Sequence, residues 1–224
     1  MRVFAALLTV LCLAATANAA LVDVRINEIL VDPTVGGGGF DTDGDGSFEN
    51  ADEFIEFYNA GAAPVDISSW QVYVGSGGSH VLRHTFSAGT SIASGGLLTL
   101  VASYTGTVPA GFVGSDENTN FLGNGGDNIA LDDPTANQFS SYVYNGDPAI
   151  TAGLPAGATL FGSVIDMGSD VDGLSIAALP DGSTSFSTGA PTPGQLNAVP
   201  EPSGLLCLLG VGGLVVSRRR LRNA

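Results

Sequence analysis

The chain contains no lysine, and among its 224 residues there are only two cysteines, two histidines and one tryptophan. Cys12 and Cys207 lie in apolar segments near the two ends, so residues 20–198 can form no disulfide and hold no thiol nucleophile. Of the seven arginines only Arg25 and Arg83 fall in this middle region, against twenty-one acidic residues, a formal charge of −19. This excludes the basic surface that nucleic-acid binding requires.

The N-terminus has the features of an export signal. Arg2 supplies a positive charge, the next thirteen residues are almost wholly apolar, and Ala17 and Ala19 are the small residues of a cleavage site. This order predicts a secretory signal peptide over residues 1–19, cut between Ala19 and Ala20. The alternative is an N-terminal membrane anchor, but the apolar core is shorter than the roughly 20 residues that a spanning helix needs.

The C-terminus carries a second pattern. Pro200-Glu201-Pro202 precedes an uncharged run of about fifteen residues, Ser203 to Ser217, and arginines cluster between 218 and 222. The run is short for a span of about 17–25 residues, and it contains glycines, which are common in membrane helices. A buried core helix is the alternative, but it would not need arginines directly after it. We therefore predict a transmembrane sorting helix within residues 199–224, with the arginines on the cytoplasmic side.

This tail resembles the PEP-CTERM sorting signal of Gram-negative bacteria, because its three parts occur in order at the end of the chain. The resemblance implies that Pro200, Glu201 and Pro202 are recognised by an exosortase, which is a membrane peptidase. It implies secretion across the inner membrane, transient anchoring through the C-terminal helix, and a final place at the cell surface or outside the cell. Such proteins often accompany exopolysaccharide production, so a biofilm role is also implied.

Residues 20–198 are long enough for one domain with a full hydrophobic core. Short apolar runs alternate with glycine-rich breaks, which is typical of an all-β sandwich or barrel. A helical turn is an alternative for residues 53–58, but Phe and Tyr favour a strand there. Trp70 is expected in the core. The expected strands are Val24–Val31, Glu53–Asn59, Trp70–Val74, His80–Phe86, Leu97–Ala102, Asn128–Leu131, Gln138–Tyr144 and Gly173–Ala177.

The order of these segments resembles the lamin tail domain, an immunoglobulin-like β-sandwich. The matching stretches are Ile26–Ile29, Asp52–Asn59, Val65–Trp70, Ile92–Gly96, Gly126–Leu131 and Pro191–Asn197. The segment from Val143 to Gly189 is longer and looser than the family pattern, so the pairing of the last strands is left open. The resemblance implies a binding or structural module without catalytic residues.

One acidic loop has the chemistry of a calcium site. Ca²⁺ prefers six to eight oxygen ligands, and acids at alternate positions with a glycine at the sixth let a short loop wrap one ion. The segment from 41 to 52 has this spacing, with Gly46 at the sixth position. The candidate ligands are Asp41, Asp43, Asp45, the carbonyl of Ser47, Glu49 directly or through water, and Asp52.

Other interpretations of this loop stay open. An EF-hand loop usually ends in glutamate, whereas Asp52 stands here with Glu53 beside it. The segment also resembles a dockerin calcium loop, which ends in Asp, but only one copy is present. A solvated acidic turn is the remaining alternative, although it leaves the repulsion among the carboxylates uncompensated. A second group of acids, Asp166, Asp170, Asp172 and Asp181, has a spacing that fits no ligand pattern.

The residue inventory argues against catalysis. Residues 20–198 contain no G-x-S-x-G motif and no P-loop. His80 and His84 are expected on one face of a strand, but the sequence offers no third zinc ligand beside them. We therefore predict a non-catalytic surface or extracellular-matrix module that binds exopolysaccharide or another exported protein. The alternative hypothesis is a secreted metal-dependent hydrolase acting on glycans or phosphodiesters, although the spacing of the acids singles out no catalytic pair.

Overall fold

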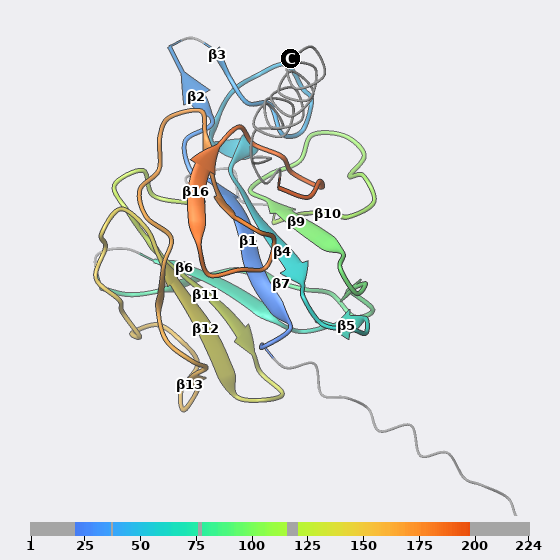
Figure 1. Ribbon diagram of the computed structural model, residues 1–224, viewed down its shortest axis with the longest axis vertical. Helices are drawn as coiled ribbons and strands as arrows, with labels where there is room; N and C mark the ends of the chain where they lie inside the picture. The colour runs from blue at the N-terminus through green and yellow to red at the C-terminus, as the bar shows by residue number, and fades with distance from the viewer. Residues whose placement is uncertain (1–20, 37, 76–77, 116–120, 198–224) are drawn as a thin grey trace, which may run out of the picture.

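A computed structural model describes residues 21–36, 38–75, 78–115 and 121–197, and within them the fold is all-β (Figure 1). The one helical element in these ranges is a single 3₁₀ turn, η1 (Asn50–Asp52). None of the helical structure in the described part has the length and apolar character that a membrane crossing demands. The predicted signal peptide and sorting helix lie outside the described residues.

The first sheet has six strands in the spatial order β10-β9-β4-β1-β15-β16. Its strands are β10 (Phe112–Gly114), β9 (Leu97–Val101), β4 (Phe54–Asn59), β1 (Val24–Leu30), β15 (Ser175–Ala178) and β16 (Phe186–Gly189). All neighbours are antiparallel except β10 and β9. Strands from the two ends of the domain therefore meet in the middle of this sheet, where β1 pairs with β15.

The second sheet has the order β13-β12-β11-β6-β7, and β14 also pairs with β12. Its strands are β13 (Thr159–Leu160), β12 (Gln138–Val143), β11 (Asn128–Asp133), β6 (Gln71–Gly75), β7 (Val81–Thr85) and β14 (Ile165–Asp166). Two small two-stranded antiparallel sheets complete the fold. One pairs β2 (Thr34–Val35) with β3 (Gly38–Gly39), and the other pairs β5 (Val65–Asp66) with β8 (Ser91–Ile92).

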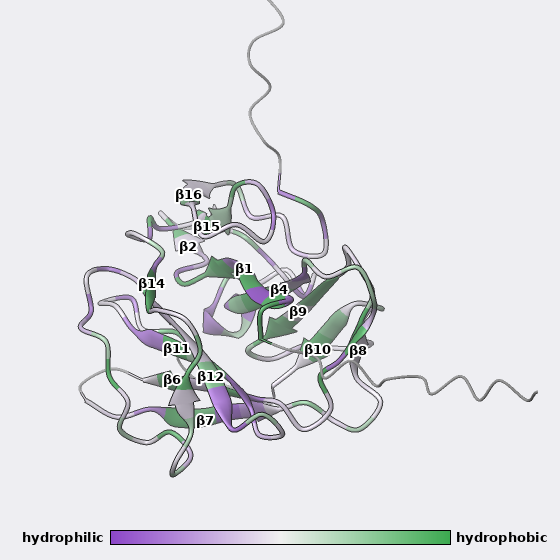
Figure 2. Ribbon diagram, turned by 60° about the horizontal axis from the view of Figure 1, so that its bottom comes forward, coloured by the Kyte–Doolittle hydropathy of each residue, from purple (hydrophilic) through white to green (hydrophobic). Residues whose placement is uncertain are grey.

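The main core lies between the two sheets, which Figure 2 shows as separate layers. Both sheets contribute buried apolar side chains to one cluster, including Ile26, Ile55, Phe57, Leu100 and Ile176 from the first and Val72, Val74, Ile129, Leu131 and Tyr142 from the second. Trp70 belongs to this cluster with 2% of its surface exposed, which confirms the core prediction. Alternate strand residues point to opposite faces, so this cluster accounts for one face of each sheet.

The outer faces of both sheets are also covered. On the second sheet, Tyr73, Ala130 and Phe139 form a cluster against Leu154 and Ala158 of the long segment before β13. On the first sheet, a separate cluster of Leu30, Phe54 and Val101 is joined by the rings of Phe40, Tyr104 and Phe112. Because both faces of the second sheet are covered, every residue of β11 is buried, and the strand does not alternate between buried and exposed residues.

Each of the eight predicted strands is confirmed, with ends shifted by a few residues. Residues 54–59 are a strand, so the helical turn considered for this segment is wrong. The open segment after Val143 supplies β13, β14, β15 and β16, of which only β15 was predicted. The missed strands are two to four residues long, too short to show periodicity in the sequence.

Candidate functional site

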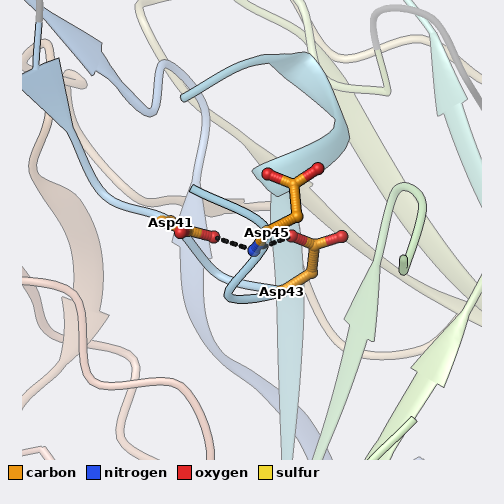
Figure 3. Close-up of side chains that lie close together, drawn as sticks. All are labelled: Asp41, Asp43 and Asp45. Carbon is orange, nitrogen blue, oxygen red and sulfur yellow. Dashed lines mark hydrogen bonds between the residues drawn. The ribbon is translucent and has the colours of Figure 1, made fainter. Parts of the chain in front are cut away.

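The acidic loop brings three of its predicted ligands together. Asp41, Asp43 and Asp45 each place one carboxylate oxygen within 4.8 Å of the others. Figure 3 shows the Asp45 backbone nitrogen between the other two carboxylates, to which it donates hydrogen bonds of 3.2 Å and 3.1 Å. Asp41 and Asp43 are half-buried and Asp45 is exposed, so the trio is accessible from solvent.

Two glycines give this loop its shape. Gly44 and Gly46 adopt φ angles of +77° and +89°, in the left-handed region that residues with a Cβ rarely occupy. This conformation turns their N–H groups toward Asp41, whose two oxygens accept bonds of 2.6 Å from Gly44 and 2.8 Å from Gly46. The loop is thus folded around the first carboxylate.

Asp52 closes the loop from a buried position. One of its oxygens accepts from the amides of Thr42 and Asp43 at 2.7 and 3.3 Å, and the other accepts from the amide of Glu49 at 3.1 Å. Burial raises the pKa of Asp52, and these bonds oppose the rise. Asp52 therefore fastens both ends of the loop. Glu49 is exposed and lies outside the group of three carboxylates, and Ser47, whose backbone carbonyl is the predicted ligand, is also exposed.

A second polar cluster, which the sequence analysis did not single out, lies on the outer face of the first sheet. The pairing of β1 with β4 shifts register between Ile26 and Glu28, so Asn27 is the extra residue of a bulge. The side-chain nitrogen Nδ2 of Asn27 donates to a carboxylate oxygen of Glu56 at 3.2 Å and to one of Asp181 at 2.9 Å. Bulges of this kind redirect a side chain, and here the bulge buries Asn27 among carboxylates.

These carboxylates hold the final loop of the domain, which we name the C-terminal strap (residues 191–197). Glu28 accepts from the backbone amide and the hydroxyl of Thr192, both at 2.9 Å. Glu56 accepts from the amide of Gly194 at 2.6 Å. Asp181 accepts from the amide of Asn197 at 3.0 Å. Three acids thus bind three backbone N–H groups of one loop.

The two glutamates of this cluster are fully buried, and they lie opposite one another on β1 and β4. Burial raises the pKa of Glu56 to about 7, and the negative charge of Glu28 adds to the rise. Burial also raises the pKa of Glu28. Acids in the middle of two strands were the one sequence signal for this cluster, because a buried strand rarely contains glutamate without a partner.

A third acid, Glu53, is buried at the start of β4. One of its oxygens accepts from the amides of Phe121 and Leu122 at 2.7 and 2.6 Å, and the other has no hydrogen-bond partner among the described residues. Burial raises the pKa of Glu53 to about 8. Glu53 ties the loop before β11 to the first sheet, and it does not belong to the aspartate trio.

The histidines do not share a strand face, so that prediction is wrong. His80 precedes β7 and is buried, with Nδ1 lying 3.3 Å from the carbonyl oxygen of Ala152. The β6–β7 register shifts, so that Leu82 faces Tyr73 while His84 faces the adjacent Val72. Neighbouring strand residues point to opposite faces, so the bulge breaks the alternation from which a shared face was expected.

Comparison with family models matches residues 17–146, more than half of the chain, to the Lamin Tail Domain. The chain belongs to the Lamin Tail Domain family. Residues 198–222 match the PEP-CTERM protein-sorting motif, as predicted from the tail. A comparison with curated proteins gave no match.

The Lamin Tail Domain match ends before β13, so the last strands and the strap come from the rest of the chain. The two matched families are structural or sorting modules, and neither is catalytic. The sorting motif implies recognition by an exosortase, export, and a surface or extracellular location in a Gram-negative bacterium. Its residues Pro200, Glu201 and Pro202 lie outside the described residues, as do Ala19 and Ala20 at the predicted signal-peptide cut.

Proposed function

We propose that this Lamin Tail Domain protein is a non-catalytic module of the cell surface or extracellular matrix that an exosortase releases from a transient membrane anchor. The match of residues 198–222 to the sorting motif carries the proposal. The signal peptide over residues 1–19 starts export, the body 20–198 folds outside the inner membrane, and residues 199–224 hold it there until cleavage. The body then binds exopolysaccharide or another exported protein.

The strap supports this order of events. Asn197 is the last described residue, and its side-chain amide donates to the carbonyls of Asn27 and Ala178 at 3.4 and 3.2 Å. Pro200 follows three residues later, so even an extended chain places the motif within about 11 Å of the folded body. Because these bonds between the strap and the sheet all involve residues before 198, cleavage at or after the motif would leave them in place.

The experiment for this function is an intact mass of the exported protein. The chain is expressed in a host with an exosortase and in the same host without it. We expect a mass that lacks residues 1–19 and the arginines at 218–222 in the first host, and the arginines retained in the second. A Glu201→Ala variant should keep its tail in both hosts. Recovery of the wild-type arginines from the first host would refute processing.

The proposal includes stabilisation by Ca²⁺ at the acidic loop. The three clustered carboxylates repel one another, and a divalent cation offers the oxygen-rich coordination that relieves this repulsion. An ion bound to the folded state alone stabilises by about 2.7 kcal/mol at a hundredfold excess over the dissociation constant. For a domain of this size that corresponds to roughly 5–11 °C in melting temperature.

The calcium proposal is tested by thermal unfolding in millimolar Ca²⁺ and in chelator. We expect the wild type to melt higher in Ca²⁺ and the double variant Asp43→Ala, Asp45→Ala to lose this difference. The double variant Asp166→Ala, Asp172→Ala removes two exposed acids elsewhere and should keep it. Identical wild-type melting in the two buffers would show that the loop holds no calcium.

The hydrolase alternative makes a separate prediction. A metal-dependent hydrolase must leave a coordination position open for water or substrate. Here the trio carboxylates already accept several amides of their own loop, an arrangement better suited to a structural ion. Turnover of glycans or phosphodiesters by the purified chain, with calcium or zinc, would favour the hydrolase. Glycan binding without turnover would favour the surface module.

A further inference from the structure

A cavity of about 220 Å³ lies between the start of β1 in the first sheet and the edge of the second sheet at β12 and β14. Leu21, Tyr142, Phe161 and Ile165 contribute apolar surface to its walls. All four pack in or against the main core, so the walls are held by the fold. The cavity shares no lining residue with the aspartate loop. The polar part of the lining comes from Arg25, Ser140, Ser163 and Thr184.

Arg25 brings a positive charge to this cavity. It donates from Nη1 to the carbonyl of Gly182 at 2.5 Å and from Nε to the carbonyl of Val22 at 3.3 Å. Both acceptors are backbone groups, and no carboxylate in the described part of the chain forms an ion pair with Arg25. An arginine without a carboxylate partner is unexpected here, because residues 20–198 contain twenty-one acids and only two arginines.

Ser140 and Tyr142 lie two residues apart on β12 and point to the same face of the sheet. Ser140 is 6% exposed, and its side chain lies beside the Tyr142 hydroxyl, whose pKa it lowers. The Tyr142 hydroxyl accepts from the amide of Ile26 at 3.2 Å. Burial raises the pKa of Tyr142, and the nearby charge of Arg25 opposes the rise. The Arg25 guanidinium is therefore the charged group at a largely apolar cavity, and the hydroxyl groups of Ser140 and Tyr142 are buried in its wall.

We propose that this cavity binds a small monocarboxylate whose apolar part is about the size of one ring. The guanidinium fork matches a carboxylate and favours it over a neutral group. The volume suits such a ligand, because a cavity on the order of 150 Å³ already accepts benzene. A monosaccharide fits less well, since its many hydroxyl groups would meet apolar walls and lose hydrogen bonds to water. The site is independent of the sorting function and of calcium.

Benzoate is the probe, and benzamide, equal in size and uncharged, is its control. Saturation-transfer NMR and isothermal titration are run on the full chain, with a protein-free sample of the same buffer and detergent as the blank. We expect benzoate to bind with a dissociation constant near the millimolar range. Benzamide should bind at least tenfold more weakly, because it lacks the charge that strengthens the hydrogen bonds to Arg25.

Three variants locate the binding. Arg25→Gln should weaken benzoate at least tenfold, while Arg83→Gln, which removes the other body arginine, should leave it unchanged. Ser140→Val replaces the hydroxyl with a methyl group and adds about one carbon to the cavity wall, so it should weaken benzoate severalfold. Valine suits a strand, so this variant tests the site even if Arg25→Gln does not fold. No binding by 50 mM, equal binding of benzamide, or unchanged affinity in both Arg25→Gln and Ser140→Val would each overturn the proposal.

Discussion

Replacement of Glu53 by glutamine should change how the stability of the domain depends on pH. The Glu53 carboxyl is fully buried, and burial raises its pKa from 4.5 to about 8. The folded protein therefore binds a proton at this site over a pH range in which the unfolded chain has released it. The stability that this group contributes is present below about pH 4.5 and is lost as the pH rises through 8.

The structure sets the size of the effect. The full shift corresponds to roughly 5 kcal/mol at about 1.4 kcal/mol per pKa unit, and about 3 kcal/mol of it falls between pH 5 and pH 8. Glutamine is a neutral isostere, and its side-chain oxygen can accept from the amides of Phe121 and Leu122 as the Glu53 carboxyl does. We expect Glu53→Gln to match the wild type at pH 5 and to be more stable by about 3 kcal/mol at pH 8.

The assay is urea unfolding at pH 5, 6, 7 and 8 in chelator, followed by the fluorescence of Trp70, the single tryptophan of the chain. With a urea dependence of about 2 kcal/mol per molar, the difference at pH 8 is roughly 1.5 M in midpoint. Asp172→Asn removes one exposed acid and controls for the change in net charge. Parallel pH profiles of wild type and Glu53→Gln would refute the reasoning, as would an equal gain in Asp172→Asn.

Two further predictions concern packing. Gly153 and Gly157 have φ angles of +84° and +85°, but a Cβ at Gly153 would lie 2.2 Å from the carbonyl oxygen of His80, whereas at Gly157 nothing lies closer than 3.9 Å. Gly157→Ala should lower the free energy of unfolding by about 1–2 kcal/mol because of backbone strain, and Gly153→Ala should lower it by roughly 1–3 kcal/mol more because of the clash. Urea unfolding measures both, and equal losses in the two variants would contradict the clash. Asn197→Ala should destabilise by about 1–3 kcal/mol and speed amide exchange in the strap, and an equal effect of the exposed Gln195→Ala would contradict this.

Much of the local structure could be predicted because strands, turns and ion loops depend on neighbouring residues. Asp41, Asp43 and Asp45 were singled out by spacing, and the structure brings their carboxylates together. The role of Asp52 was harder to predict. Its spacing predicts a ligand, and that stays a prediction; the structure adds that its buried carboxylate accepts from the amides of Thr42 and Glu49 and so joins the two ends of the loop. Burial depends on the packing of η1, which spacing does not describe.

The strap and the cavity could not be predicted in this way. Glu28 and Thr192 are 164 positions apart, and their contact requires β1 to pair with β15. The bulge at Asn27 depends on the register between β1 and β4, and a shift of one residue would turn its side chain to the other face. Arg25 lies on β1, so the pairing of this strand in the first sheet also sets the position of Arg25 at the cavity.

The sequence alone determined the division of the chain into two apolar, arginine-bearing ends and an acidic, cysteine-free body, together with its family and the strands of five residues or more. These properties follow from composition and from patterns a few residues long, and they hold before any folding. Only the tertiary structure decided which acids are buried, which loop they hold and where a lone arginine borders a cavity. Burial and long-range hydrogen bonds arise when distant strands pack, because only then does water leave the groups between them.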